Sequence, residues 1–332
     1  MTKTPTIKNR RDILKGAAAA GGAAVFAPAV LAQSQFPSRA VRVVVPFPAG
    51  ATTDMLARLI SQRLSETMGQ PFVVENVGGG GGSIGADQVA KAAADGHTLL
   101  FGNITFTTTT SSLIYVKRAR HTFDDFVAVS VGAWVPILFL AAKDVPANNL
   151  KEFVNYARKA TTPVLYGSTG PGSIMNLCGE VLKRDAGIQM DHIPFRGAAP
   201  LVTDMLAGRI HFGGDQLSSS LQHVLSGSLK AMAVATKSVA LPQVPTAREM
   251  GFPNLELQGW NGFLAPKGTP DAVVNRIQQQ VAEAVNRPDV AKRMTDVGAE
   301  PSGNTPAEMS RMLRDQIAQV RPVVEELKLV VE

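Results

Sequence analysis

The sequence has very little of what catalytic, metal-binding or disulfide-stabilised proteins need. A single cysteine, Cys178, excludes an internal disulfide. Cys178 lies in an apolar helical pattern, so we predict a small buried side chain rather than a nucleophile. The five histidines form no metal-binding pair at helical spacing, and no serine stands in a Gly-x-Ser-x-Gly elbow. We therefore expect no enzymatic activity, no cofactor and no metal.

Long apolar runs and strong basic charge are also missing from most of the chain. After residue 32, no segment reaches the roughly 18 uncharged apolar residues that a membrane-spanning helix needs. Removing the five basic residues and one acid of residues 1–32 takes the formal net charge from +6 to +2. Nucleic-acid binding would call for clustered basic residues with interleaved aromatics, so we do not expect a nucleic-acid partner.

Residues 1–32 have the pattern of an export signal. Basic residues precede a run rich in Ala and Gly, and Val30–Ala32 provides small residues for cleavage before Gln33. The adjacent Arg10 and Arg11 resemble a twin-arginine signal, although such pairs also occur in general secretory leaders. We expect a soluble, exported protein from which this segment is removed.

The main functional candidate is a turn between a strand and a helix. Val43–Val45 favour a buried strand, which Pro46 and Pro48 end. Gly50 permits a tight turn, and Thr52–Asp54 provide oxygens that we expect to cap the following helix. Free N–H groups at such a helix start can hold a carboxylate or phosphate, although an ordinary turn would look the same. The predicted ligand contacts here are Phe47, Pro48, Ala49, Gly50, Ala51, Thr52, Thr53 and Asp54.

A second turn repeats this pattern in the other half of the chain. Val164–Tyr166 forms the predicted strand, Gly167–Gly172 the loop, and Ser173 the cap of a helix that ends near Gly187. Two such loops facing each other could grip a small anion with amide and hydroxyl donors from separate lobes. The alternative is that these residues only form turns and caps. The predicted contacts of this loop are Ser168, Thr169, Gly172 and Ser173.

Four further residues are candidates because they lie at strand ends or helix starts. Asn103 follows the predicted strand Thr98–Phe101, and Asp215 follows a short strand. Asp215 could accept a hydrogen bond from a ligand hydroxyl or amine, or could cap the next helix. Arg196 and Ala199 stand beside the start of another predicted helix.

The glycines Gly78–Gly82 supply an alternative function. With Gly85 they match the spacing of a dinucleotide-binding loop, at Gly80, Gly82 and Gly85. The expected ribose-binding acid is missing, because the next strand ends in Gly102–Asn103. We interpret the glycines as a loop at the cleft rim, and keep an exported cofactor-dependent oxidoreductase as the alternative.

Alternating strands and helices predict an α/β protein. About 300 residues exceed what one compact core usually accommodates, so we expect two lobes of mixed sheets flanked by helices. Val131–Ala142 is a core strand or a crossing between lobes, and Leu255–Ala265 a second crossing. Thr269–Pro270 and Thr305–Glu308 have the pattern of starts for the two C-terminal helices. The predicted division is a leader (1–32), a first lobe (33–141), a second lobe (142–257) and a return to the first lobe (258–332), with hinges near Ala141 and Leu257.

Motifs along nearly the whole chain resemble the substrate-binding proteins of tripartite tricarboxylate transporters, which include the Bordetella uptake proteins. The order and spacing of these short motifs carry the resemblance over about 230 residues. They are Val45–Gly50 with Thr53–Asp54, Gly69–Pro71, Val74–Asn76, Ile84–Ala86, Asp95–Gly96, Tyr166–Ser168, Gly172–Ser173, Pro194–Gly197, Leu241–Thr246 and Leu264–Pro270.

The resemblance implies a periplasmic receptor with the class II binding-protein fold. Such receptors close two lobes on a small organic acid, a mono- or dicarboxylate, and deliver it to the membrane subunits of the transporter. The family's pattern implies ligand contacts at Phe47–Asp54, at Ser168–Ser173 and at Asp215, partly through water. We expect a monomer.

Three departures from the family pattern bear on the site. Ala51 stands where a second glycine is usual, Asn176 where a histidine is common, and Gln216 where asparagine usually follows the aspartate. Ala51 implies a loop that is less free near the ligand, and Gln216, which changes a side-chain length beside a predicted contact, implies a different ligand.

Overall fold

The computed structural model describes residues 36–109 and 121–329. The predicted leader lies outside the described residues. The helices and strands that follow lie in the compact unit Arg39–Glu332.

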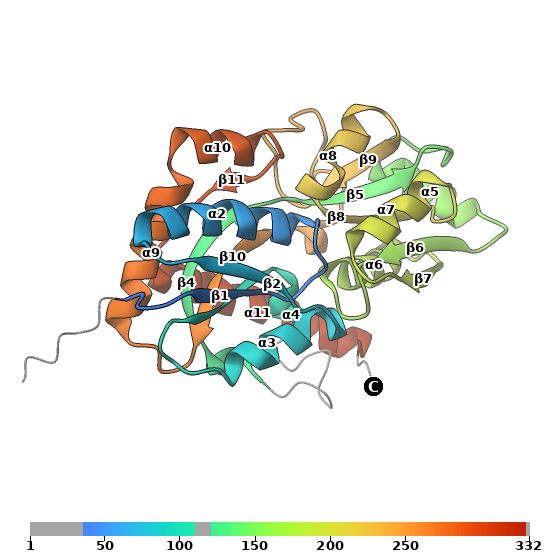
Figure 1. Cartoon of the computed structure of the whole chain (residues 1–332). Helices are drawn as coiled ribbons and strands as arrows, with labels where there is room; N and C mark the ends of the chain where they lie inside the picture. Colours follow the sequence, from blue (N-terminus) through green and yellow to red (C-terminus); the bar gives the residue numbers. More distant parts are fainter. Residues whose placement is uncertain (1–35, 110–120, 330–332) are drawn as a thin grey trace, which may run out of the picture. The chain divides into compact units, whose positions relative to one another are not determined.

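Strands of the first sheet run in the spatial order β11-β4-β10-β3-β1-β2 (Figure 1). The first sheet is mixed, because β1 is parallel to β2 and β3 whereas β10 is antiparallel to β3 and β4. Val43–Val45 are fully buried in β1, which confirms the predicted strand. The bounds are β1 (Val41–Val45), β2 (Phe72–Asn76), β3 (Thr98–Asn103), β4 (Phe126–Trp134), β10 (Trp260–Pro266) and β11 (Glu300–Pro301).

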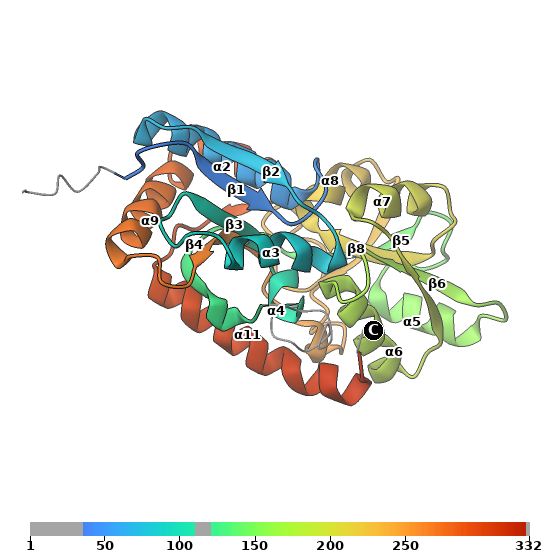
Figure 2. The same ribbon diagram turned by 60° about the horizontal axis from the view of Figure 1, so that its bottom comes forward.

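Helices cover both faces of this sheet. Figures 1 and 2 show α2 and α3 on opposite faces, and α9 packs beside α2. These elements are α2 (Thr52–Met68), α3 (Ser83–Ala90), α4 (Thr105–Thr109), α9 (Asp271–Val285), α10 (Pro288–Thr295), α11 (Pro306–Leu327), and the short 3₁₀ helices η1 (Gly80–Gly82) and η2 (Phe123–Asp125).

The second sheet has the spatial order β7-β6-β8-β5-β9 and is also mixed. Its core includes Phe153 and Phe212, whose stacked rings have centroids 4.4 Å apart. Cys178 is buried there, as predicted, and burial raises the pKa of its thiol to about 12. The elements are β5 (Ile137–Ala142), β6 (Val164–Ser168), β7 (Met190–Pro194), β8 (Phe212–Gln216), β9 (Leu229–Val234), α5 (Leu150–Lys159), α6 (Ile174–Ala186), α7 (Ala198–Leu206) and α8 (Leu217–Leu225).

The chain passes twice between the sheets. Val131–Ala142 spans the end of β4, the crossing itself at Val135 and Pro136, and β5, so Ala141 lies inside a strand. The return runs from β9 to β10 through η3 (Pro253–Leu255). The two crossings are joined, because the Val135 N–H donates to the Gly259 carbonyl at 3.0 Å. A Cβ at Gly259 would lie 2.0 Å from the Val135 oxygen, so this approach requires glycine.

The two mixed sheets and the two crossings confirm the predicted fold class. We call the first sheet with its helices the first lobe and the second sheet with its helices the second lobe. The residue boundaries given above for the lobes, and the hinges near them, stay predictions.

The starts of α5, α11 and α9 differ in how they are capped. The Asn149 side chain accepts the Glu152 N–H at the start of α5, and Thr305 and Glu308 form the predicted capping box of α11. The predicted cap at Thr269 is wrong. Pro270 is the N-cap residue of α9, and the Thr269 hydroxyl instead donates to the Pro266 carbonyl at 2.8 Å.

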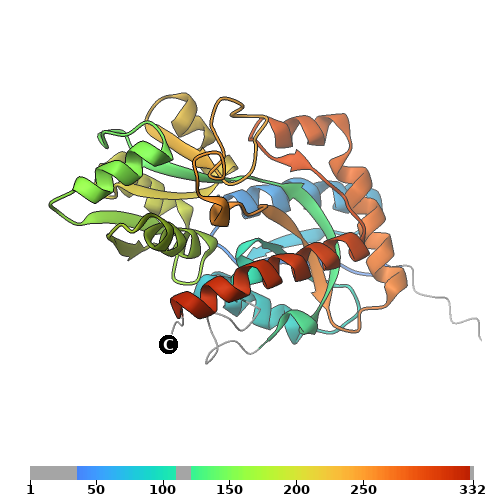
Figure 3. The same ribbon diagram turned by 180° about the vertical axis from the view of Figure 1, so that it is seen from behind.

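Helix α11 contacts both lobes (Figure 3). Gln316 accepts a hydrogen bond from the Trp260 indole at 3.0 Å, whereas Glu326 forms an ion pair of 2.7 Å with Arg184 of α6. A C-terminal element thus ties the first lobe to the second. Within the described residues, no helix combines the length and apolarity needed to cross a bilayer.

Candidate functional site

The loop after β1 is held in shape by one buried carboxylate. Asp54 accepts the Gly50 N–H at 2.9 Å and an N–H of the Asn76 side chain at 2.9 Å. Asn76 also donates to the Phe47 carbonyl at 3.1 Å. Burial opposes ionisation of Asp54, but hydrogen bonds from Arg58, Gly50 and Asn76 outweigh it and lower the pKa of this carboxyl. Asp54 therefore fixes the conformation of the loop through its hydrogen bonds.

The helix that follows this loop has an open N-terminus. Thr52–Asp54 do not cap it as predicted, because they lie inside α2 and the N-cap residue is Ala51. Ala51 has no side-chain acceptor, and no side chain of the described residues caps α2. The first N–H groups of α2 and the positive end of its dipole are thus available to an anion.

The glycine loop supports this turn from behind. A Cβ at Gly85 would lie 2.7 Å from the Val77 carbonyl and 3.0 Å from Pro46. Gly82 packs in the same way against the ring of Phe47. The glycines therefore allow close packing under the first turn.

Two amides of the second predicted loop are already hydrogen-bonded within the protein. Ser168 accepts the Gly170 N–H at 3.2 Å, and Asn176 accepts the Gly172 N–H at 3.0 Å. Ser173 caps α6 by accepting the Asn176 N–H at 3.3 Å, as predicted. These donors already have partners within the loop.

A buried network fixes this loop from below. Ser168 and the His192 ring nitrogen Nε2 are 2.7 Å apart, and His192 stacks on Tyr166. Burial lowers the pKa of His192. The Tyr166 hydroxyl donates to Glu180 at 2.5 Å and accepts from Asn176 at 3.1 Å. The loop is therefore held by hydrogen bonds that connect it to β6, β7 and α6.

A second open helix N-terminus comes from α7. Its N-cap residue Gly197 has φ +105° and no side-chain cap. A Cβ at Gly197 would lie 3.1 Å from the Pro48 ring, so the two lobes touch here and glycine is required. Ala198 follows as the first helical residue, whereas Arg196 and Ala199 are exposed.

These loops meet in a small cavity of about 30 Å³. Both lobes contribute to its lining. The lining residues are Phe47, Pro48, Ala51, Thr52, Thr53, Asn103, Ile104, Thr105, Thr169, Ile174, Gly197, Ala198, Asp215 and Gln216.

Eight of the predicted contacts line this cavity and the other eight lie beside it. Those in the lining are Phe47, Pro48, Ala51, Thr52, Thr53, Asn103, Thr169 and Asp215. Those outside it are Ala49, Gly50, Asp54, Ser168, Gly172, Ser173, Arg196 and Ala199. The sequence reasoning missed Ile104, Thr105, Ile174, Gly197, Ala198 and Gln216, most of which are chain neighbours of predicted contacts.

Polar side chains of the lining are tied to one another across the cavity wall. Asn103 donates to the Thr53 hydroxyl at 2.9 Å and accepts the Thr105 N–H at 2.9 Å. The Thr52 hydroxyl of the first lobe lies 2.7 Å from the Ser219 hydroxyl of the second. Ser219 in turn donates to Asp215 at 3.1 Å. Burial raises the pKa of Asp215 to about 6.

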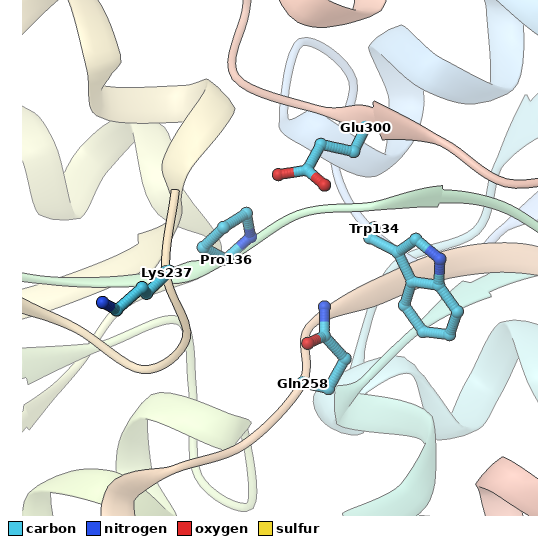
Figure 4. Close-up of a pocket in the computed structure, with 5 residues that line it drawn as sticks. All are labelled: Trp134, Pro136, Lys237, Gln258 and Glu300. Carbon is cyan, nitrogen blue, oxygen red and sulfur yellow. The ribbon is translucent and has the colours of Figure 1, made fainter. Parts of the chain in front are cut away.

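A separate hollow lies at the crossing between the lobes (Figure 4). It is lined by Trp134, Pro136, Lys237, Gln258 and Glu300, none of which was predicted to bind ligand. Figure 4 shows Pro136 on the strand of the first crossing and Gln258 on the return.

No group of three or more His, Cys, Asp or Glu residues in the described part of the chain could hold a metal ion. The chemistry of the cavity is thus that of main-chain N–H groups, hydroxyls and amides around one carboxylate.

Comparison with known proteins identifies the kind of molecule to which this cavity belongs. Residues 56–329 match the family described as the tripartite tricarboxylate transporter family receptor. A protein of Pseudomonas sp. (strain P51), named for the tcbD-tcbE intergenic region, is 33% identical over 336 residues, which cover 99% of this chain and 98% of the relative.

Three solved structures have the same fold over nearly their whole length. One titled a periplasmic transporter is 37% identical with a TM-score of 0.84, covering 90% of this chain and 100% of the other. Rpa4515 of R. palustris with adipate is 35% identical, TM-score 0.82, covering 88% and 98%. MatC (Rpa3494) from Rhodopseudomonas palustris with bound malate is 33% identical, TM-score 0.80, covering 87% and 100%. The matched family is one of receptors rather than enzymes, which confirms the prediction from the sequence.

Proposed function

This chain belongs to the tripartite tricarboxylate transporter family of receptors, and we propose that it binds a small organic acid in the cavity between its lobes. One observation carries the proposal. The uncapped N-termini of α2 and α7 share a cavity whose described lining contains no lysine or arginine. Such N–H groups stabilise a carboxylate without a basic side chain.

The roles of the lining residues follow from their remaining hydrogen-bonding capacity. Ala51 leaves room at the start of α2, and the Thr53 hydroxyl can still donate because Asn103 uses only its oxygen. Gly197 and Ala198 bring the N-terminus of α7 to the opposite side. Relatives with bound adipate and malate make a carboxylate the ligand to test first.

A screen by thermal unfolding tests this function. A ligand at 100 times its dissociation constant adds about 2.7 kcal/mol to the free energy of unfolding, which raises the melting temperature measurably. We expect one or more mono- or dicarboxylates to do this, and their uncharged amides to do so much more weakly. If amides raise the melting temperature as much as the acids, or if only uncharged compounds do, the carboxylate receptor is wrong.

Export and delivery complete the proposal. Residues 1–32 act as a leader that brings the receptor to the periplasm, where as a monomer it hands the acid to the membrane subunits of a tripartite transporter. Replacing Arg10 and Arg11 by lysine tests the route, because a twin-arginine signal loses export while a general secretory leader keeps it. Cell fractionation with antibody detection separates the two outcomes.

A further inference from the structure

Asp215 introduces a negative charge into a cavity that is proposed to receive an anion. It stands in β8 and is the ionisable residue among the described residues of the lining. Burial raises the pKa of Asp215 to about 6, so the carboxyl is ionised at pH 7.5. No lysine or arginine of the described lining neutralises it.

The hydrogen bonds around Asp215 have a defined direction. An ionised carboxylate only accepts, so the Ser219 hydroxyl donates to Asp215. Since the proton of Ser219 is then committed, the Thr52 hydroxyl must donate to Ser219 over their 2.7 Å separation. What Thr52 and Asp215 still offer the cavity is oxygen lone pairs.

The cavity lining therefore offers two sets of groups of opposite character. The donors are the N-termini of α2 and α7 and the Thr53 hydroxyl, which keeps its proton because it accepts from Asn103. The acceptors are Asp215 and the Thr52 oxygen. A carboxylate suits the donors, whereas the acceptors call for a group that donates hydrogen bonds.

We propose that this cavity selects carboxylic acids that carry a hydroxyl or ammonium group away from the carboxylate, and that Asp215 is the residue that recognises this donor. The inference rests on the proposed carboxylate-binding function and narrows its ligand class. An acid with an apolar tail adds no hydrogen-bond donor to the Asp215 carboxylate beyond those of Ser219 and Gln216, and a dicarboxylate places a second negative charge against it.

Acids of equal length that differ only at the far end provide the test. One set is butanoate, 4-hydroxybutanoate, 4-aminobutanoate and succinate, and the other is hexanoate, 6-hydroxyhexanoate, 6-aminohexanoate and adipate. Calorimetry at pH 7.5 should show the hydroxy or amino acid binding at least about tenfold tighter than the plain acid and the diacid of that length, as expected for a hydrogen bond to a charged group. Comparing the hydroxy acid with the amino acid of the same length shows which hydrogen-bond donor is preferred.

Variants identify the residue responsible. Asp215→Asn should reduce the preference to within about threefold and strengthen diacid binding, whereas Asp215→Glu should retain it. Asp191→Asn is the matched control, because it removes one exposed acid from the same lobe outside the cavity. The matched acids are compared on the wild-type protein, which needs no variant. The test therefore stands even if Asp215→Asn folds poorly.

Two results overturn the inference while leaving the receptor function in place. One is plain acids or diacids binding to the wild type as tightly as the matched donor-bearing acids. The other is a folded Asp215→Asn protein that keeps the wild-type preference. If no carboxylate in these sets or in the thermal screen binds, the proposed function fails and this inference fails with it.

Discussion

The two strand-to-helix turns have similar sequences but opposite states of hydrogen bonding. In the first, the N-cap residue is Ala51 and the N-terminus of α2 is open to the cavity. In the second, Ser173 caps α6 and Asn176 occupies the Gly172 N–H. The residue type at the N-cap thus decides whether the N–H groups of a helix start are free to bind a ligand or only support the wall of the cavity.

The difference also shows where the molecule gives up stability for binding. An alanine at an N-cap forgoes about 1 kcal/mol relative to Ser, Thr, Asn or Asp. The first turn offsets this by the bonds of Asp54 behind the loop. In the second lobe the open helix start is that of α7, at Gly197, and not that of the turn that resembles the first.

The largest effect is expected from closing the open turn. Ala51→Asp places a carboxylate at the N-cap of α2, where it competes with the ligand's own carboxylate for the same N–H groups. We expect at least about a 100-fold loss of acid affinity by calorimetry, together with up to about 1 kcal/mol higher free energy of unfolding.

Ala51→Ser separates capping from charge. It fills the cap without a negative charge, so its loss of affinity should be smaller than that of Ala51→Asp, about tenfold. If Ala51→Asp bound acids as tightly as the wild type, the N-terminus of α2 could not be where the carboxylate lies.

Asp54→Asn should weaken the first turn by about 2 kcal/mol at pH 7, because a buried carboxylate that accepts several hydrogen bonds is replaced. The pH dependence has a definite sign. The pKa of Asp54 is lowered in the folded protein, so its contribution is present above the unfolded value near 4 and is lost as pH falls through the folded value.

Urea unfolding at several pH values measures this contribution. The stability difference between wild type and Asp54→Asn should shrink as pH falls below about 4. The second turn, Ser168–Ser173, contains no acid of its own, and its pH dependence arises instead from His192, whose pKa is lowered by burial and whose ring contacts Ser168. A difference that stays constant between pH 7 and pH 3 would contradict the assigned role of the Asp54 charge.

Much of the fold could be predicted because its signals are local. The β-branched Val43–Val45 form a buried strand, and Thr305 with Glu308 forms a capping box as its pattern indicated. The first crossing was located less well, because Val131–Ala142 is apolar throughout and its burial does not show where one sheet ends. The crossing at Val135 and Pro136 is revealed by the pairing of β4 and β5 in different sheets, with strands far away in sequence.

Part of the cavity lining was predicted for the same reason, while the roles of these residues in binding stay predictions. Strand ends and helix starts drew attention to Thr53, Asn103 and Asp215, which line the cavity. Which amides are free depends on side chains from elsewhere, such as Asn176, and these partners cannot be assigned from spacing alone. Gly197 was missed as a contact because its place against Pro48 arises from the approach of the two lobes.

Ser173→Ala is the counterpart of the Ala51 variants in the second turn. It removes the cap of α6 and should lower the free energy of unfolding by about 1 kcal/mol. Because Ser173 does not line the cavity, acid affinity should stay within about twofold of the wild type by calorimetry. A loss of affinity as large as that of Ala51→Asp would mean that both turns hold the ligand directly.

The smallest effect is expected for the hydroxyl pair that joins the first turn to the second lobe. Thr52→Val removes the bond to Ser219 and should lower the free energy of unfolding of the ligand-free protein by about 0.5–1.5 kcal/mol. A double-mutant cycle with Ser219→Ala isolates the pair, because the two losses should not add. Thr67→Val on the same helix is the control, since Thr67 bonds only to carbonyls of its own turn. If the losses measured by urea unfolding are fully additive, the Thr52–Ser219 hydrogen bond does not couple the two lobes. The first turn then lies beside the second lobe without being held to it by this bond.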